Sequence, residues 1–295
     1  MDMVVRVPRL PAAGETIAGG AFAVIPGGKG ANQAVASARS GAPTRMVGRV
    51  GADEHGRRLW RDLDAEGIDV TRLRTDPEAA TGVALISVDP AGENTIIVVA
   101  GANGRVQPGD AAGAFAGAGI CLLQGEIPAD AVFGAARLAR EAGCAVYLDP
   151  APPGGLPDAV WPLVTLALPN ALEAGVLTGI AVTDAESAAA AGRSLMVRGA
   201  GSAIVKLGAR GAVLVTPAGV TPIPVFPVQA QDTTAAGDCF AGALAAARAD
   251  GAEVLEAATF ASGAAALSAT RPGAQPSLPT REETLAFLRG RRGGV

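Results

Sequence analysis

The feature that most constrains the fold is a regular alternation of short apolar runs with alanine-rich stretches, which begins at about residue 44. The apolar runs have the length of buried strands, and the stretches between them have the length of helices. Strands and helices that alternate in this way predict βαβ units and a mostly parallel sheet. The predicted elements, in chain order, are TRMVGRVG, HGRRLWRDLDAEG, GICLLQ, AVFGAARLAREAG, CAVYLDP, LVTLALP, a helix over 184–199, the strands SAIVKLG, AVLVT and GVTPIPV, and helices near 236–249, 252–268 and 280–288.

Two regions depart from the alternation, because no helix follows each of their strands. They are GETIAGGAFAVIPGG near the start and TGVALISVDPAGENTIIVVAGAN at 81–103, where β-rich runs flank the turn Asp89-Pro90-Ala91-Gly92. Such pairs predict hairpin strands of a small separate sheet. No linker rich in Pro, Gly and Ser divides the chain into two large halves. We therefore expect one α/β domain over 1–295, with lid strands from about 3–25 and 81–100.

Composition excludes several classes of function. A net charge of −4 with dispersed Lys and Arg gives no basic surface for nucleic acid. No run of 18 apolar residues occurs, so no membrane span is predicted. Cys121, Cys144 and Cys239 are widely spaced and His55 is the single histidine, so neither a disulfide framework nor a zinc site is predicted. A reducing, cytoplasmic location fits this cysteine usage.

The segment Asp232-Thr233-Thr234-Ala235-Ala236-Gly237-Asp238 reads as a loop that leads into a long alanine-rich helix. Free N–H groups and the helix dipole at such a terminus attract an anion, and small residues let a phosphate approach the backbone. The carboxylate of Asp238 would repel a phosphate, but it suits a general base beside a sugar hydroxyl and a transferring phosphoryl group. The alternative is structural, with Thr234 as an N-cap and Asp238 as a first-turn acid.

Two further segments follow predicted strands. Asn170 and Glu173 have the spacing of a capping box, and they also stand at the carboxyl end of a parallel strand, where Glu173 would hold Mg²⁺ through water. Lys206-Leu207-Gly208-Ala209-Arg210-Gly211 has glycines that let backbone lie against a nucleotide, although a tight turn explains them equally well.

A glycine-rich segment, Gly27-Gly28-Lys29-Gly30-Ala31-Asn32-Gln33, opens a helix after an apolar run. It is not a GxxxxGK[ST] loop, so it need not bind ATP phosphates. Glycines that bring backbone close to a polyol, together with the Asn32 amide, predict a pocket that recognises hydroxyl groups. Glu126 and Asp2 add carboxylate acceptors, and each of them alone also fits an exposed or capping acid.

The chain resembles the ribokinase-like sugar kinase family over residues 2 to about 288. The resemblance rests on a series of segments, in order PGGKGANQAVASARSGA, TGVALISVDPAGEN, AGAN, PAPP, PN with Glu173 and LTG, KLGARG, DTTAAGD and RPGAQPSLPTREE. The lid text and the tail GAQPS resemble the ribokinase branch more than the fructokinase or adenosine kinase branches. The resemblance implies a three-layer α/β/α fold with a β lid, a homodimer through the lid, and ATP-dependent phosphorylation of D-ribose at its 5-hydroxyl.

The resemblance also implies roles for individual residues. Asp238 would take the proton of the 5-hydroxyl, and the N–H groups of Ala235, Ala236, Gly237 and Asp238 would form the anion hole. The residues expected to bind ribose are Asp2, Gly28, Lys29, Gly30, Asn32, Glu126 and Asp238, and those expected around ATP are Asn170, Lys206, Gly208, Gly211, Gly237 and Ser262. A potassium ion is implied beside the anion hole, at Asp232, Thr234, Ser268, Arg271, Gly273 and Ser277, mostly through backbone carbonyls.

Alternatives remain within and outside the kinase class. Deoxyribose, another pentose, fructose or a nucleoside is a possible acceptor, and a sugar-binding module without turnover is the alternative from another class. The presence of Asp238 disfavours the latter, because binding alone needs no acid beside an anion site.

The chain departs from similar sequences at two places. Lys206 stands where they commonly have Thr, and the strand with an Asn that normally precedes Asp2 is missing. A start roughly a dozen residues upstream would supply one strand of typical length and its turn, and we expect the sequence as given to be poorly stable and to bind ribose weakly.

Overall fold

The computed structural model describes residues 1–292. Its larger sheet has six strands in the order β12-β11-β10-β9-β8-β7. Strands β7 to β10 run parallel, and β11 and β12 join them antiparallel, with Ala203 paired to Val215. The bounds are β7 (Ile120–Gln124), β8 (Ala145–Asp149), β9 (Leu166–Ala167), β10 (Ala203–Lys206), β11 (Ala212–Thr216) and β12 (Gly219–Ile223). The predicted, mostly parallel sheet is confirmed.

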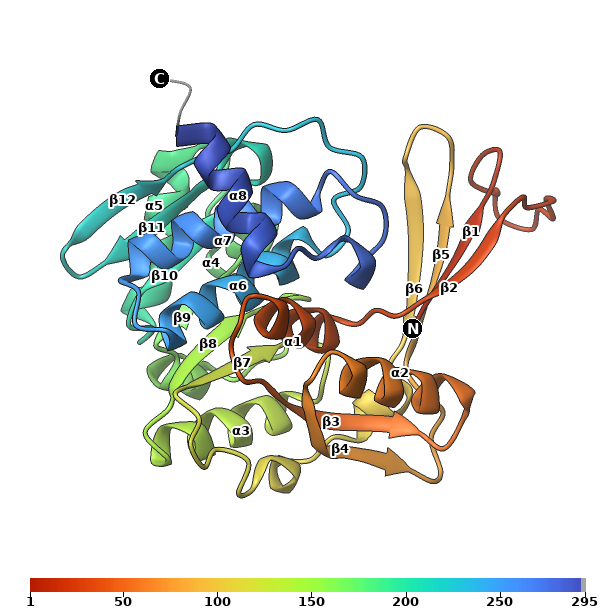
Figure 1. Ribbon diagram of the computed structural model, residues 1–295, viewed down its shortest axis with the longest axis horizontal. Coiled ribbons are helices and arrows are strands. Elements are labelled where there is room, and N and C mark those ends of the chain that lie inside the picture. The colour runs from red at the N-terminus through yellow and green to blue at the C-terminus, as the bar shows by residue number, and fades with distance from the viewer. Residues whose placement is uncertain (293–295) are drawn as a thin grey trace.

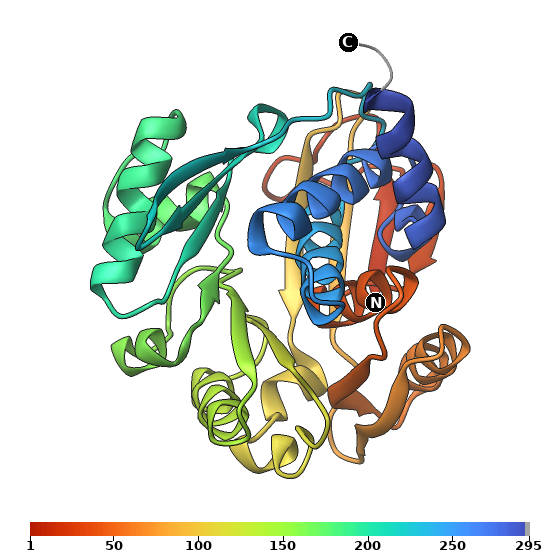
Figure 2. The same cartoon turned by 60° about the vertical axis from the view of Figure 1, so that its left-hand side comes forward.

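Helices cover both faces of this sheet (Figures 1 and 2). On one face, Leu166 and Leu214 pack into a core with α1 (Lys29–Arg39), α6 (Ala236–Ala249) and α7 (Val254–Ser268), and α8 (Arg281–Arg292) packs on α7. On the other face, Leu148 packs with α3 (Ala129–Glu141), and Val213 packs with α4 (Ala171–Thr178) and α5 (Ala185–Val197). The three-layer α/β/α arrangement is therefore confirmed. Short 3₁₀ helices occupy Gly101–Arg105, Pro108–Ala111, Asp158–Leu163, Gly208–Arg210 and Gln275–Ser277.

A parallel pair of strands, β3 (Arg45–Gly51) and β4 (Asp69–Asp76), forms its own two-stranded sheet. Helix α2 (Glu54–Ala65) covers it and buries Leu59 and Leu63, and Asp53 caps this helix by accepting the N–H of Gly56. Strand β4 was not predicted from the sequence, because charged residues interrupt the apolar pattern of 69–76.

The pair β3–β4 does not hydrogen-bond to β7, the neighbouring edge of the larger sheet. Helix α1 packs against both β3 and β7. A cavity of about 1300 Å³ is lined by both strands, among others by Met46, Gly48 and Leu122. No strand of residues 1–292 fills this space, so the parallel sheet is interrupted at β7.

The separate small sheet stands to one side of the molecule (Figure 1). Its strands are β1 (Asp2–Arg6), β2 (Phe22–Ile25), β5 (Val83–Val88) and β6 (Asn94–Val99), in the order β2-β1-β5-β6. Strand β1 runs parallel to β5, with Asp2 beside Ala84, and the other pairs are antiparallel. The strand expected in GETIAGG does not form, since 15–20 make no regular element and β2 pairs with β1 instead. Because β1 begins at Asp2, this residue lies at the base of the lid.

Among residues 1–292, none of the helices has both the length and the apolar character needed to cross a membrane.

Candidate active site

The sugar-binding residues expected from the sequence lie around one cavity, the cavity of about 1300 Å³ that also extends between β3 and β7. Its lining joins the start of β1, the first turns of α1 and α6, and the loop after β7. Asp2, Gly28, Lys29, Gly30, Asn32, Glu126 and Asp238 all line it. Segments separated by more than two hundred residues therefore contribute to one polar pocket beneath the lid, whose residues Ile86, Ile96 and Val98 face the same cavity.

Asp238, in the first turn of α6, is almost fully buried, with 5% of its surface exposed. Its Oδ2 accepts the Asn32 Nδ2–H at 2.9 Å, and its Oδ1 accepts the Gln33 Nε2–H at 3.2 Å. Burial raises the pKa of Asp238 to about 6, against the opposing effects of the Lys29 ammonium and of these two amides. A carboxylate tuned in this way is ionised near neutral pH and retains enough basicity to accept a proton.

The backbone before Asp238 presents free donors. Ala235 adopts φ 60°, the left-handed region, and it is the one non-glycine residue with positive φ within the described part of the chain. Such strain is typical of functional sites, where surrounding structure holds the backbone. Within residues 1–292 the N–H groups of Ala235, Gly237 and Asp238 have no protein acceptor, whereas Ala236 donates to the Thr233 carbonyl at 3.2 Å. Three of the four predicted anion-hole donors are therefore free, and Ala236 is already engaged.

Asn32 lines the cavity, and one of its two side-chain polar atoms has no hydrogen-bond partner in residues 1–292. Its Nδ2 is held by Asp238, while its Oδ1 is buried without a hydrogen-bond partner in residues 1–292. A buried unpaired acceptor is costly, so this oxygen suits a hydroxyl donor of a bound polyol. The predicted role of Asn32 in binding hydroxyl groups rests on this atom.

The glycine-rich turn holds acids close to the pocket. The N–H of Lys29 donates to Glu126 Oε2 at 2.9 Å, and a Cβ on Gly27 would lie 2.1 Å from Asp2 Oδ2. Burial raises the pKa of both Glu126 and Asp2. Burial disfavours the Lys29 ammonium, but the carboxylates of Asp238, Asp149, Glu126 and Glu173 outweigh that effect and raise its pKa. Lys29 therefore remains charged among acids.

The residues expected around the nucleotide come mainly from β10, the turn between β10 and β11, and helices α6 and α7. Lys206, at the end of β10, has its Nζ 3.6 Å from the position of a Cβ on Gly237. Gly211 packs against Val225, where a Cβ would lie 2.6 Å from a methyl group, and Ser262 of α7 donates to the Pro224 carbonyl at 2.9 Å. Gly211 and Ser262 therefore flank the same segment, and the space beside Gly208 is open.

Asn170 and Glu173 form the predicted capping box at the start of α4. The Asn170 N–H donates to Glu173 Oε2 at 2.7 Å, and the Glu173 N–H donates to Asn170 Oδ1 at 2.9 Å. Glu173 is buried and lines the large cavity, and burial raises its pKa. The structural and functional interpretations of this segment are therefore compatible, because the capping carboxylate still faces the cavity.

Two loops that were expected to hold a cation are tied together by Asp232. Its Oδ1 accepts the Thr234 N–H at 2.9 Å, and its Oδ2 accepts the Gly273 N–H at 2.8 Å. Burial disfavours the carboxylate, but these bonds outweigh it and lower the pKa of Asp232. Arg271 pairs with Glu283 at 2.7 Å, and the hydroxyls of Ser268 and Ser277 donate to Ala265 and Ala274 carbonyls. The side chains of Asp232, Ser268, Arg271 and Ser277 therefore already have protein partners. The groups in these loops that suit a monovalent cation are the backbone carbonyl oxygens.

Sequence reasoning missed Gln33, Gln124 and Asp149. Gln33 and Asp149 are buried beside Asp238, and Gln124 donates to Gln33 Oε1. Gln33 lies in the glycine-rich segment GGKGANQ, several other residues of which were predicted to bind the sugar. Asp149 lies at the carboxyl end of the predicted strand CAVYLDP, and polar residues at the carboxyl ends of parallel strands often contribute to ligand sites.

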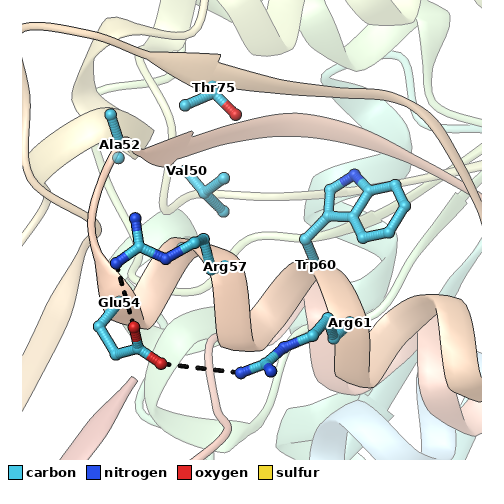
Figure 3. Close-up of a pocket in the computed structure, with 9 residues that line it drawn as sticks. Val50, Ala52, Glu54, Arg57, Trp60, Arg61 and Thr75 are labelled. Atoms are coloured by element: carbon cyan, nitrogen blue, oxygen red, sulfur yellow. Dashed lines mark hydrogen bonds and ion pairs between the residues drawn. The ribbon is translucent and has the colours of Figure 1, made fainter.

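A second cavity, of about 580 Å³, lies beside α2 and contains none of the predicted site residues (Figure 3). Trp60 and Arg57 line it together with Val50 and Thr75 from β3 and β4. Arg57 pairs with Glu54 at 3.0 Å, and Arg61 lies 3.7 Å from the same carboxylate. Asp2, Glu126, Ala235 and Asp238 line the first cavity and not this one.

Comparison with known proteins gives concordant results. Residues 1–281 match the pfkB family carbohydrate kinase. The chain is 39% identical to the ribokinase of Haemophilus influenzae over 290 residues (97% of this chain and 95% of that protein) and 34% identical to the deoxyribokinase of Salmonella typhi over 292 residues (98% and 95%).

Solved structures give the same result. The structure is similar to the ribokinase of Thermotoga maritima, with a TM-score of 0.89 and 36% identity over 98% of this chain and 96% of that one. It is also similar to the Arabidopsis thaliana ribokinase complexed with ribose and ATP, with a TM-score of 0.88 and 33% identity over 98% and 95% of the two chains. The chain therefore belongs to the pfkB family of carbohydrate kinases.

Proposed function

We propose that this carbohydrate kinase transfers the γ-phosphoryl group of ATP to the 5-hydroxyl of D-ribose. The observation that carries the proposal is the buried carboxylate of Asp238, which lies at a helix terminus with free N–H groups and in a cavity lined by hydroxyl-binding side chains. The ribokinases among its relatives, and the Arabidopsis ribokinase that binds ribose and ATP, support this acceptor and donor.

In the proposed reaction, the Asp238 carboxylate accepts the proton of the 5-hydroxyl as its oxygen forms a bond to the γ-phosphorus. The bond from the γ-phosphorus to the β,γ-bridging oxygen breaks, and ADP leaves with that electron pair. The N–H groups of Ala235, Gly237 and Asp238 stabilise the charge on the transferring oxygens. Asn32 Oδ1, Glu126 and Asp2 accept hydrogen bonds from the remaining sugar hydroxyls, and Lys29 balances their charge.

Two cations complete the proposal. Glu173 would hold Mg²⁺ through water, since both of its oxygens already accept hydrogen bonds from Asn170 and the carboxylate faces the cavity. Backbone carbonyls around Asp232 and Gly273 would hold K⁺, because the side chains there are otherwise engaged. Mg²⁺ would neutralise charge on the nucleotide phosphates, and K⁺ would fix the loop before α6.

We further propose that the protein forms a homodimer through the lid in a reducing cytoplasm. The three cysteines are free thiols. The lid exposes apolar residues, with Phe22 and Ile97 each more than 60% exposed, and exposed apolar patches mark association surfaces. Light scattering coupled to size exclusion tests this: Ile97→Glu should yield monomers. The matched change Val197→Glu, on α5 away from the lid (Figure 1), should not alter the mass.

The acceptor is tested by ADP release from the purified protein with a panel of D-ribose, deoxyribose, another pentose, fructose and a nucleoside. The highest kcat/KM is expected with ribose. Deoxyribose is the second candidate, because a deoxyribokinase is among the relatives. A preference for deoxyribose, or binding of ribose with no ADP release, would contradict the proposal.

A further inference from the structure

A buried ion pair connects the nucleotide side of the site to its centre. The Lys206 ammonium donates to Asp149 Oδ1 at 3.0 Å, and the side chains are 13% and 3% exposed. The two residues end neighbouring parts of one sheet, Lys206 on β10 and Asp149 on β8, with β9 between them. A carboxylate this deeply buried requires a counter-charge, and the ammonium supplies it.

Gln33 joins the same carboxylate to the general base. Its Nε2 donates to Asp149 Oδ2 at 3.0 Å and to Asp238 Oδ1 at 3.2 Å. Its Oε1 accepts from Gln124, which fixes the orientation of the amide so that the donor faces both carboxylates. One continuous set of contacts therefore runs from Lys206 through Asp149 and Gln33 to Asp238.

The other side of the Lys206 ammonium faces the first turn of α6. Its Nζ is 3.6 Å from the position of a Cβ on Gly237, whose own N–H has no protein acceptor within residues 1–292. An anion held by that N–H would lie within reach of the ammonium as well. Lys206 thus stands between a fixed carboxylate and the place where negative charge is to be stabilised.

We propose that Asp149 is a positioning residue for phosphoryl transfer: it holds the Lys206 ammonium against the anion hole, where Lys206 binds the oxygens of the transferring phosphoryl group. This inference rests on the proposed function. Asp149 itself does not line the cavity around which the expected sugar-binding residues lie. It acts through Lys206 and, by way of Gln33, on the carboxylate of Asp238.

The pair also affects the proton affinity of Asp238. The titratable groups that face Asp238 are Lys29 from α1, Asp2 from β1, Asp149 from β8 and its neighbour Cys239 in α6. Asp149 is a like charge and raises the pKa of Asp238. With Lys206 removed, that charge is no longer balanced and the effect should grow, whereas an amide at position 149 should remove it.

The experiment compares Lys206→Thr, Asp149→Asn and the double variant with the unchanged protein, by kcat, KM for ATP, KM for ribose and the pH dependence of kcat/KM. Lys206→Thr should lower kcat by about 10²-fold, the scale for one anion-hole donor, and shift the acidic limb to higher pH. Asp149→Asn should lower kcat by roughly 10-fold or more and shift that limb to lower pH. KM for ribose should change little in either.

The double variant separates positioning from mere stability. The double variant contains no unbalanced buried charge. Its melting temperature and the low-pH limb of its kcat/KM profile should therefore return toward those of the unchanged protein. Its kcat should equal that of Lys206→Thr alone. Full kcat in either single variant, or a double variant whose loss is the product of the two single losses, would overturn the inference. An unchanged protein that phosphorylates a different sugar would contradict the proposed function alone, and the same comparison would then be made with that sugar.

Discussion

Asn32 donates its side-chain N–H to Asp238 Oδ2 at 2.9 Å, although the two residues are 206 positions apart in the sequence. The bond joins the first turns of α1 and α6, which pack side by side. It holds one oxygen of the Asp238 carboxylate and leaves Asn32 Oδ1 without a hydrogen-bond partner in residues 1–292. This hydrogen bond, together with the one that Gln33 donates to Asp238 Oδ1, therefore ties the start of α1 to the start of α6.

Asp238→Asn should preserve the fold and nucleotide binding but lower kcat by roughly 10²-fold or more, because an amide cannot accept the hydroxyl proton. Steady-state ADP release with ribose measures this. Asp250→Asn, at the other end of α6 and exposed, is the matched control and should have normal kcat. Turnover near the normal rate in Asp238→Asn would rule out the assigned base.

Activity should depend on pH through Asp238. Its pKa is raised from 3.8 to about 6, so kcat/KM for ribose should fall as pH decreases below about 6, where the carboxylate becomes protonated. Stability should change in the opposite sense, because a raised carboxyl pKa contributes stability at low pH that is lost as pH rises through 6. Rate profiles and thermal melts from pH 3.5 to 8, on the protein and on Asp238→Asn, check both. A limb near pH 4 would contradict the environment described for Asp238.

Replacing sodium by potassium should raise activity severalfold, since an ion on the carbonyls near Asp232 would fix the backbone that precedes α6. Rates in the two chlorides at matched ionic strength measure this. Asp232→Asn should weaken the response, because the loops at Thr234 and Gly273 lose their shared carboxylate. Equal rates in both salts would argue against a cation site.

Filling the space between β3 and β7 should stabilise the protein. The two strands, of 7 and 5 residues, each leave one edge without a strand partner beside a cavity of about 1300 Å³. A backbone group that is shielded from water without a hydrogen-bond partner costs about 1–3 kcal/mol. Met1 is buried and lines this cavity. An apolar, strand-forming extension placed before Met1 should therefore raise the melting temperature by at least about 4 °C and lower KM for ribose.

A Gly/Ser extension of equal length is the control for this experiment, and it should leave the melting temperature unchanged. If the two extensions gave the same melting temperature, the cavity would not be an acceptor for a strand.

Local patterns in the sequence predicted the parallel sheet, its helices and several polar residues of the candidate site. Alternating runs such as CAVYLDP and AVFGAARLAREAG predicted the parallel sheet and its helices, because period and length are local properties. The capping box of Asn170 and Glu173 and the small residues before Asp238 were legible for the same reason. Strand β4 was missed because its charged residues hide the apolar pattern.

Which side chains meet depends on the packing of segments that are distant in the sequence. Gln33, Asp149 and Lys206 come from α1, β8 and β10, and their contacts depend on how strands align in one sheet and how α1 lies beside α6. The pKa of Asp238 likewise depends on burial by segments distant in the chain. Sequence patterns record local backbone preference, whereas desolvation and contacts between distant residues arise only when the core is packed, so the network around Asp149 could be found only in the folded molecule.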